Sequence, residues 1–208
     1  MYTIVSGGAN GADKKWEEVA KLYKCNTVVY TVNEYNNLLD IQKRDIEFQY
    51  FTVVCKLNRN TIPRETYAGK LVRRDMLQAN LGDSLFAIGS ILNLGEKDSK
   101  GNLNKSGKQI ISGGTAYATE RAIQLLKPTF VFNQRDNNWY KWNYENNIFE
   151  ECETPTLSFN STCVGTRELS KEGEKAITDV FKKTFPDFTI KTNKKIDYLN
   201  SLRNKLNK

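Results

Sequence analysis

Two glycine-rich turns hold the residues best placed for chemistry. The first is Ser6-Gly7-Gly8-Ala9-Asn10-Gly11-Ala12-Asp13 and the second is Ser112-Gly113-Gly114-Thr115. Each follows a short run rich in β-branched residues and precedes a segment with helical apolar spacing, which predicts strand, tight turn and helix. Paired glycines let the backbone approach a ligand closely, and the N–H donors at a helix start favour an anion such as phosphate. We therefore expect both turns to face a ligand.

The residue types exclude several kinds of catalytic site. The chain contains no histidine, which rules out Ser-His-Asp and Cys-His nucleophiles and any histidine-ligated metal. Acid–base chemistry would rest on Asp, Glu, Lys or Tyr. The four cysteines are widely spaced and form no CxxC pair, which favours structural thiols in a reducing compartment over a zinc site or a disulfide scaffold: Cys25, Cys55, Cys152 and Cys163. We expect neither a metal nor a bound cofactor.

Length and charge predict one domain followed by a basic tail. The 208 residues and 39% hydrophobic content suit a single globular domain, which we place at residues 1–188. Residues 189–208 carry six basic side chains and one acidic, five of the net +7 charges, and are expected to be a solvated tail or short helix. Nucleic acid is the less favoured partner. No apolar run approaches the length of a membrane span, so we expect a cytoplasmic protein, in the host cytoplasm if it is viral.

Periodicity and turn signals predict alternating strands and helices. Strands are expected at 2–5, 27–32, 84–88 and 129–133, and helices at 13–23, 64–80, 115–126 and 171–184. Residues 33–63 suggest one or two further helices, and 94–108 a mobile surface loop. Residues 138–152 alternate aromatic and polar side chains around Asn146-Asn147, which predicts a β-hairpin. Its rings are expected to cover a hydrophobic edge, the alternative being that one or two stack on a base.

This order predicts an α/β three-layer sandwich with a mainly parallel sheet and an appended β-hairpin. Ligands of such sheets bind beyond the carboxyl ends of the strands. Both glycine turns are expected at such ends, so a single crevice could take both.

Both turns resemble known nucleotide-binding motifs. Residues 112–120, from Ser112 to Glu120, resemble the PGGxGTxxE motif of the LOG proteins, phosphoribohydrolases of cytokinin nucleotides. The first turn is similar to the SGGAxGAD turn of the YpsA-like branch. Both branches belong to the SLOG superfamily of Rossmann-like domains, and residues 130–134, 139–142 and 165–168 resemble small phage-encoded proteins of this kind. The resemblance covers most of residues 2–185 and implies a Rossmann-like fold and a homo-oligomer.

The resemblance also implies site residues. Glu120 takes the catalytic position of the LOG motif and Arg74 that of its partner arginine, so Glu120 would steady an oxocarbenium-like sugar or orient a water while Arg74 holds phosphate. Without the resemblance, Glu120 is an exposed helix carboxylate and Arg74 a surface cation. Asp13 lies near the start of the first predicted helix, where its negative charge would interact favourably with the helix dipole. Alternatively, it would bind a ribose hydroxyl. The expected ligand-binding residues are Ser6, Gly7, Gly8, Asn10, Gly11, Asp13, Arg74, Gly89, Gly113, Gly114, Thr115, Tyr117 and Glu120.

The sequence departs from the LOG motif at four positions: Ser112, Ala116, Tyr117 and Asp75. The bulk of Tyr117 and the negative charge of Asp75 weaken the case for hydrolysis and leave nucleotide binding in place. We therefore expect a binder of a phosphorylated nucleotide, or of a ligand of the ADP-ribose or cyclic-nucleotide type, which a phage could use to sequester a host immune signal. The alternative is a phosphoribohydrolase or N-glycosidase acting on a nucleoside monophosphate. A third, weaker interpretation is DNA binding through the basic tail, which predicts strong salt dependence.

Overall fold

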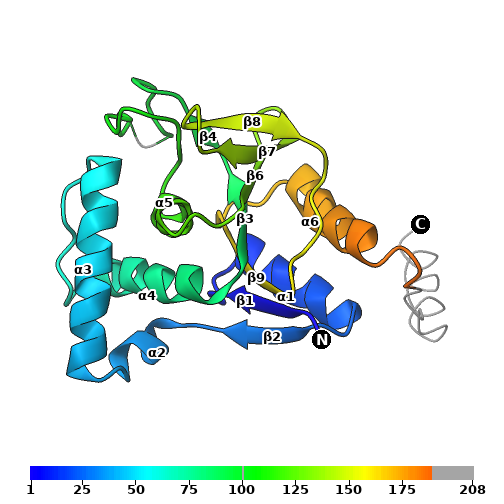
Figure 1. The fold of residues 1–208 in the computed structure, drawn as a ribbon, viewed down its shortest axis with the longest axis horizontal. Helices are drawn as coiled ribbons and strands as arrows, with labels where there is room; N and C mark the ends of the chain where they lie inside the picture. The colour runs from blue at the N-terminus through cyan, green and yellow to red at the C-terminus, as the bar shows by residue number, and fades with distance from the viewer. Residues whose placement is uncertain (100, 189–208) are drawn as a thin grey trace, which may run out of the picture.

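A seven-stranded sheet crosses the molecule (Figure 1) in the order β2-β1-β9-β3-β6-β7-β8. The computed structural model describes residues 1–99 and 101–188, so the expected basic tail lies outside the described residues. The first five strands in this order run parallel to one another. β7 pairs antiparallel with β6, and β8 pairs antiparallel with β7. The strands are β1 Thr3–Ser6, β2 Asn26–Val29, β3 Ser84–Gly89, β6 Thr129–Asn133, β7 Asn138–Asn143, β8 Ile148–Cys152 and β9 Asn160–Gly165.

Helices cover both faces of this sheet, as predicted. On one face α1 (Ala12–Leu22) and α6 (Lys171–Thr184) bury Trp16, Phe86 and Phe181 in one cluster. On the other face lie α4 (Tyr67–Leu81) and α5 (Thr115–Gln124), with α3 (Asp40–Leu57) packed outside them and the short α2 (Val32–Asn36) beside α4 (Figure 1). The chain is thus an α/β protein with a Rossmann-like layered fold, and the hairpin of β7 and β8 is appended at one edge.

Capping residues explain where two elements differ from the predicted bounds. The predicted strand 27–32 ends at Val29, because Thr31 caps α2: its hydroxyl accepts from the Asn33 N–H at 3.1 Å, and Glu34 accepts from the Thr31 N–H. The predicted helix 64–80 begins at Tyr67, because the Thr66 hydroxyl accepts from Gly69 N–H at 2.9 Å.

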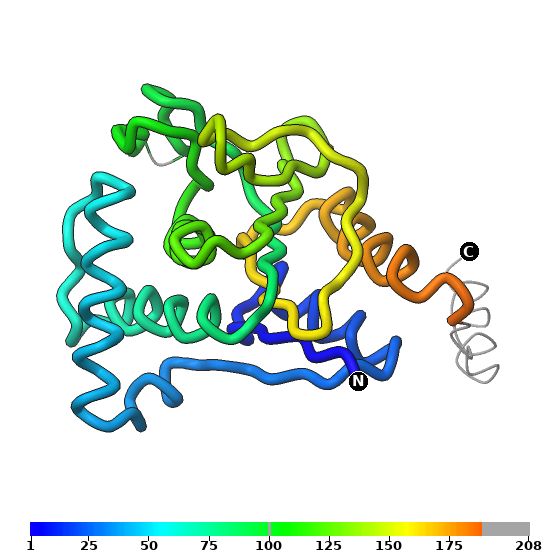
Figure 2. The backbone as a smooth tube through the Cα atoms, viewed as in Figure 1, coloured from blue at the N-terminus to red at the C-terminus, as the bar shows by residue number. Residues whose placement is uncertain are grey.

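The central strand β9 was missing from the prediction. It lies between β1 and β3, with Val5 opposite Thr162 and Phe86 opposite Cys163. An extended connection over residues 153–159 carries the chain from the hairpin edge back to the middle of the sheet (Figure 2). Residues 160–162 are polar, which hid the strand, yet the Thr162 hydroxyl is satisfied by donating to the Gln78 carbonyl at 2.7 Å.

The strand before the second glycine turn lies outside the main sheet. Residues 110–111 form β5 (Ile110–Ile111), which pairs antiparallel with β4 (Ile91–Leu92) in a separate two-stranded ribbon. The predicted mobile loop over 94–108 joins these two strands. Asn104 within it is 2% exposed, and its amide lies within hydrogen-bonding distance of the carbonyls of Leu92 and Lys108. This side chain anchors the loop against the ribbon.

Candidate functional site: the carboxyl edge of the sheet

All five parallel strands end at one edge of the sheet. β1 ends at Ser6, β9 at Gly165, β3 at Gly89 and β6 at Asn133, and the register places Ile88 opposite Gly165 and Gly89 opposite Asn133. The first glycine turn leaves β1 directly. The second reaches the same edge, because the Ser112 N–H donates to the carbonyl of Ser90, the residue after β3, at 2.8 Å. The edge therefore collects both turns, even though β5 is not one of its strands.

A buried charged cluster lies under the first turn. Arg74 reaches from α4 and is 5% exposed, with its Nη1 at 3.2 Å from Asp75 Oδ1 and 4.0 Å from Asp13 Oδ2. It also donates to the side chain of Gln78. Arg74 is thus not the surface cation that its local sequence indicates, but the central charge of an enclosed network.

Burial sets the protonation of the carboxyl groups in this cluster. Asp13 is 4% exposed, and this burial raises its pKa to about 7, against the lowering influence of Arg74. Burial likewise raises the pKa of Asp75 to about 6, with Arg74 again opposing the shift. Arg74 Nε and Asp13 Oδ1 have no hydrogen-bond partner within the described residues. The cluster therefore holds protons near neutral pH and has unused hydrogen-bonding capacity.

The glycines of the first turn make room for the protein itself. A Cβ on Gly7 would lie 2.6 Å from Asp13 Oδ2 and would clash with the Arg74 guanidinium. Gly11 has φ of +92°, and a Cβ there would lie 2.5 Å from the backbone oxygens of Thr166 and Arg167. These glycines were expected to let a ligand approach the backbone closely. In the structure the groups that approach it are the Arg74 side chain and the backbone of the loop after β9.

The second turn is open. Gly113 and Gly114 are exposed, and a Cβ built on either would meet no atom within 4 Å. Among the described residues no acceptor takes a hydrogen bond from the N–H of Gly113 or Gly114. Arg59 donates to the Gly113 carbonyl at 2.8 Å, which holds a cation beside the turn at the start of α5. Free N–H groups, a helix N-terminus and a guanidinium make this an anion-binding geometry.

Glu120 and Arg74 have different partners in the structure. Glu120 is 3% exposed rather than exposed, and its Oε2 lies 2.7 Å from Nζ of Lys108. Burial raises the pKa of Glu120, while the hydrogen bond from Lys108 lowers it. Lys108 in turn lies over the Trp142 ring at 5.3 Å. Glu120 is thus ion-paired toward the hairpin side, whereas Arg74 is ion-paired under β1.

The other expected residues divide between the edge and the core. Asn10 is exposed and Gly8 half-buried on the first turn, and Thr115 is the first residue of α5. Gly89 is buried at the end of β3, where a Cβ would lie 2.9 Å from Ile111 Cγ2. Tyr117 packs in the core cluster of α3, α4 and α5, stacked on Tyr50.

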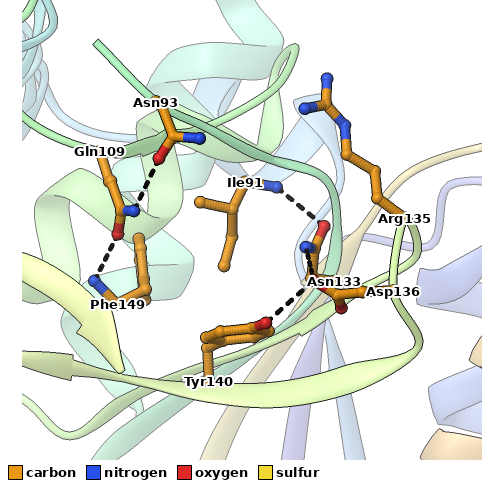
Figure 3. Close-up of a pocket in the computed structure, with 8 residues that line it drawn as sticks. All are labelled: Ile91, Asn93, Gln109, Asn133, Arg135, Asp136, Tyr140 and Phe149. Carbon is orange, nitrogen blue, oxygen red and sulfur yellow. Dashed lines mark hydrogen bonds between the residues drawn. The ribbon is translucent and has the colours of Figure 1, made fainter. Parts of the chain in front are cut away.

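A polar pocket of about 240 Å³ adjoins the end of β6 (Figure 3). It is lined by Ile91, Asn93, Gln109, Asn133, Arg135, Asp136, Tyr140 and Phe149. Asn133 accepts from the Ile91 N–H at 3.1 Å and donates to Asp136, which also accepts from the Tyr140 hydroxyl at 2.9 Å. These polar groups form hydrogen bonds with one another, and the network links β4 to the end of β6. Three rings of the hairpin are structural: Trp139 is buried in the cluster of α1 and α6, and Trp142 and Phe149 are buried in the cluster that includes Ala118 and Ala122 of α5.

Arg59 and Lys108 were not among the expected residues. Arg59 follows α3 and Lys108 precedes β5, and neither lies in a recognisable motif. Their roles depend on contacts with residues 54 and 12 positions away. No local signal in the sequence could have indicated them.

Neither a protein-family model, nor a curated protein, nor a solved structure matches this chain. Within residues 1–99 and 101–188, no helix has the length and apolar character to cross a membrane. The same part of the chain holds no cluster of three or more His, Cys, Asp or Glu side chains suited to a metal ion.

Proposed function

We propose that the protein binds a phosphorylated nucleotide at the carboxyl edge of the sheet, with a phosphate at the turn of residues 113–115. The observation that carries this proposal is the open second turn. Its two N–H groups, which have no acceptor within the described residues, lie at the start of α5, and Arg59 lies beside them. Backbone donors and a guanidinium together suit the several acceptor oxygens of a phosphate.

Electrostatics orient the ligand. The first turn lies over Asp13 and Asp75, which flank Arg74. Glu17 accepts from the Ser6 hydroxyl at 3.0 Å, and Lys14 Nζ lies 4.0 Å from Glu17 Oε2. A carboxyl group can accept from a hydroxyl group whether or not it is ionised, and an ionised one also repels a phosphate. We place the uncharged, hydroxyl-bearing part of the nucleotide toward residues 7–11 and the phosphate toward residues 113–115.

Holding the ligand is favoured over cleaving it. Cleavage of the LOG type needs Glu120 and Arg74 to act on one sugar phosphate. Here Glu120 is ion-paired with Lys108, whereas Arg74 is enclosed with the carboxyl groups of Asp13 and Asp75. A nucleotide binder of this kind fits sequestration of a signalling nucleotide, such as an ADP-ribose or cyclic-nucleotide signal in a host infected by a phage.

Calorimetric titration tests the binding site. We expect Gly113→Asp to weaken binding of AMP, ADP-ribose or a cyclic dinucleotide at least about tenfold, roughly 1.4 kcal/mol, because a carboxylate would oppose the phosphate. Gly95→Asp is the matched control, since Gly95 also has positive φ (+76°) and no atom within 4 Å of a built Cβ. Equal affinities for wild type and Gly113→Asp, or no binding of any of these nucleotides, would contradict the proposal.

A base-release assay tests the hydrolytic alternative. We expect wild-type protein to release no free base from a panel of nucleoside monophosphates above the background without protein. Release that disappears in Glu120→Ala, while titration shows that the ligand still binds, would establish an enzyme instead.

A further inference from the structure

The pocket beside the end of β6 has an aromatic floor and an aliphatic wall opposite it (Figure 3). The half-buried ring of Tyr140 lies across one side, and the side chain of Ile91 projects toward that ring from the other. Phe149 closes a third side. Apolar walls that face each other favour a flat ring between them. The volume of about 240 Å³ lies below the roughly 300–1,000 Å³ of drug-sized sites, so the pocket suits one small ring system.

The two charged side chains that line this pocket already have partners. Arg135 is ion-paired with Glu96, and its side chain extends away from the cavity (Figure 3). Asp136 accepts from the Asn133 amide at 2.7 Å and from the Tyr140 hydroxyl at 2.9 Å. Burial and this bond to Asp136 raise the pKa of Tyr140 to about 12, so its ring is uncharged at neutral pH. A charged ligand would lose hydration here without gaining a counter-ion, so the pocket favours an uncharged one.

The side-chain amide of Gln109 gives the pocket a polar edge. Its Nε2 donates to Asn93 Oδ1 at 2.8 Å, and its Oε1 accepts from the Phe149 N–H at 2.7 Å. A primary amide has two N–H donors and two acceptor lone pairs, so one donor and one acceptor position of Gln109 are left over by the described residues. A donor beside an acceptor complements the edge of adenine, where the 6-amino group lies next to a ring nitrogen, and glutamine pairs with adenine in this way.

We propose that this pocket binds an adenine ring, stacked on Tyr140 and hydrogen-bonded by Gln109. The bonds of Tyr140 to Asp136 and of Gln109 to Asn93 hold both groups in place before the ring arrives, which lowers the entropic cost of binding. The ring comes either as free adenine or as the base of an adenine nucleotide. The pocket includes no residue of either glycine turn, so this site stands independently of the phosphate site.

Ligand-observed NMR titration with adenine tests the stacking contact. We expect a dissociation constant of roughly 0.1–1 mM, which suits a ligand of about ten non-hydrogen atoms. Tyr140→Leu should weaken binding at least about tenfold because the stacking surface is lost, whereas Tyr140→Phe keeps the ring and should bind within about threefold of wild type. Tyr67→Leu is the control, because Tyr67 is 67% exposed on α4 and lies outside the pocket.

The polar edge is tested first on the ligand, which leaves the protein unchanged. Purine lacks the 6-amino group of adenine and should bind at least about fivefold more weakly, because Gln109 then loses a partner. Gln109→Glu keeps an acceptor for the Phe149 N–H but has no N–H to donate, and should weaken adenine binding about tenfold.

Competition with AMP distinguishes the two sources of the ring. Displacement of adenine by AMP would identify an adenine nucleotide, and adenine that AMP does not displace would identify the free base. Gly113→Asp should bind adenine as tightly as the wild type, and loss of binding there would place the ring at the second turn and overturn the proposal. No binding of adenine up to roughly 5 mM, binding insensitive to Tyr140→Leu, or purine bound as tightly as adenine would also overturn it.

Discussion

The free energy of unfolding is expected to fall as the pH rises from about 4 to about 7, and Asp13→Asn to remove the part of this fall that Asp13 contributes, leaving the smaller part from Asp75. Folded Asp13 has a pKa of about 7, against 3.8 for an ordinary aspartate, so the folded protein keeps a proton that the unfolded chain releases. Stability from this group is therefore complete below about pH 4 and lost as the pH passes 7. At 1.36 kcal/mol per pKa unit, the loss attributable to Asp13 is about 4 kcal/mol.

Urea denaturation at a series of pH values measures this effect. Asparagine keeps the shape of the protonated carboxyl group, so the variant should match the wild type near pH 4 and be more stable near pH 8. Glu18→Gln on the same helix, with a side chain 65% exposed, should leave the pH profile of the wild type unchanged. Parallel pH profiles for wild type and Asp13→Asn would contradict a buried, proton-holding Asp13.

Gly11→Ala is expected to destabilise the fold by about 3–5 kcal/mol. Gly11 has φ of +92° and ψ of −130°, a conformation that side chains do not tolerate, and its Cβ would lie 2.5 Å from two backbone oxygens of the loop after β9. Backbone atoms cannot move aside as a side chain can. To relieve the clash, the first turn would have to move away from residues 166–167, and the packing between them would be lost.

Gly113→Ala is the matched control for this substitution. Gly113 also has positive φ (+70°), but a Cβ there meets no atom within 4 Å. We expect it to cost about 1 kcal/mol, the backbone strain alone. Equal losses at the two positions in urea denaturation would show that the first turn is not packed as described.

The sequence predicted elements with strong local signals. The bounds of α6 were predicted without error, because Ser170 caps its start, accepting from the Gly173 N–H at 3.0 Å, and Pro186 lies just beyond its end. The hairpin of β7 and β8 was likewise predicted, from alternating aromatics around Asn147, whose φ of +54° suits a tight turn. Each of these signals lies within a few residues of the element that it predicts.

What the sequence could not predict depends on contacts between distant segments. β9 was missed because Asn160, Ser161 and Thr162 look like a loop, and their burial depends on neighbours supplied by β1 and β3. The two glycine turns look alike in sequence, yet one is filled by Arg74 from α4 and the other is open. The ion pair of Glu120 with Lys108 was hidden in the same way, since Lys108 lies in a polar stretch of no regular pattern.

Mass spectrometry of small molecules released on denaturing the purified protein tests nucleotide binding most directly. We expect the wild type to release an intact phosphorylated nucleotide, Gly95→Asp to release the same molecule, and Gly113→Asp to release none. Recovery of equal amounts from wild type and Gly113→Asp would contradict a phosphate site at residues 113–115. Recovery of only a free base or a ribose phosphate would contradict binding without cleavage.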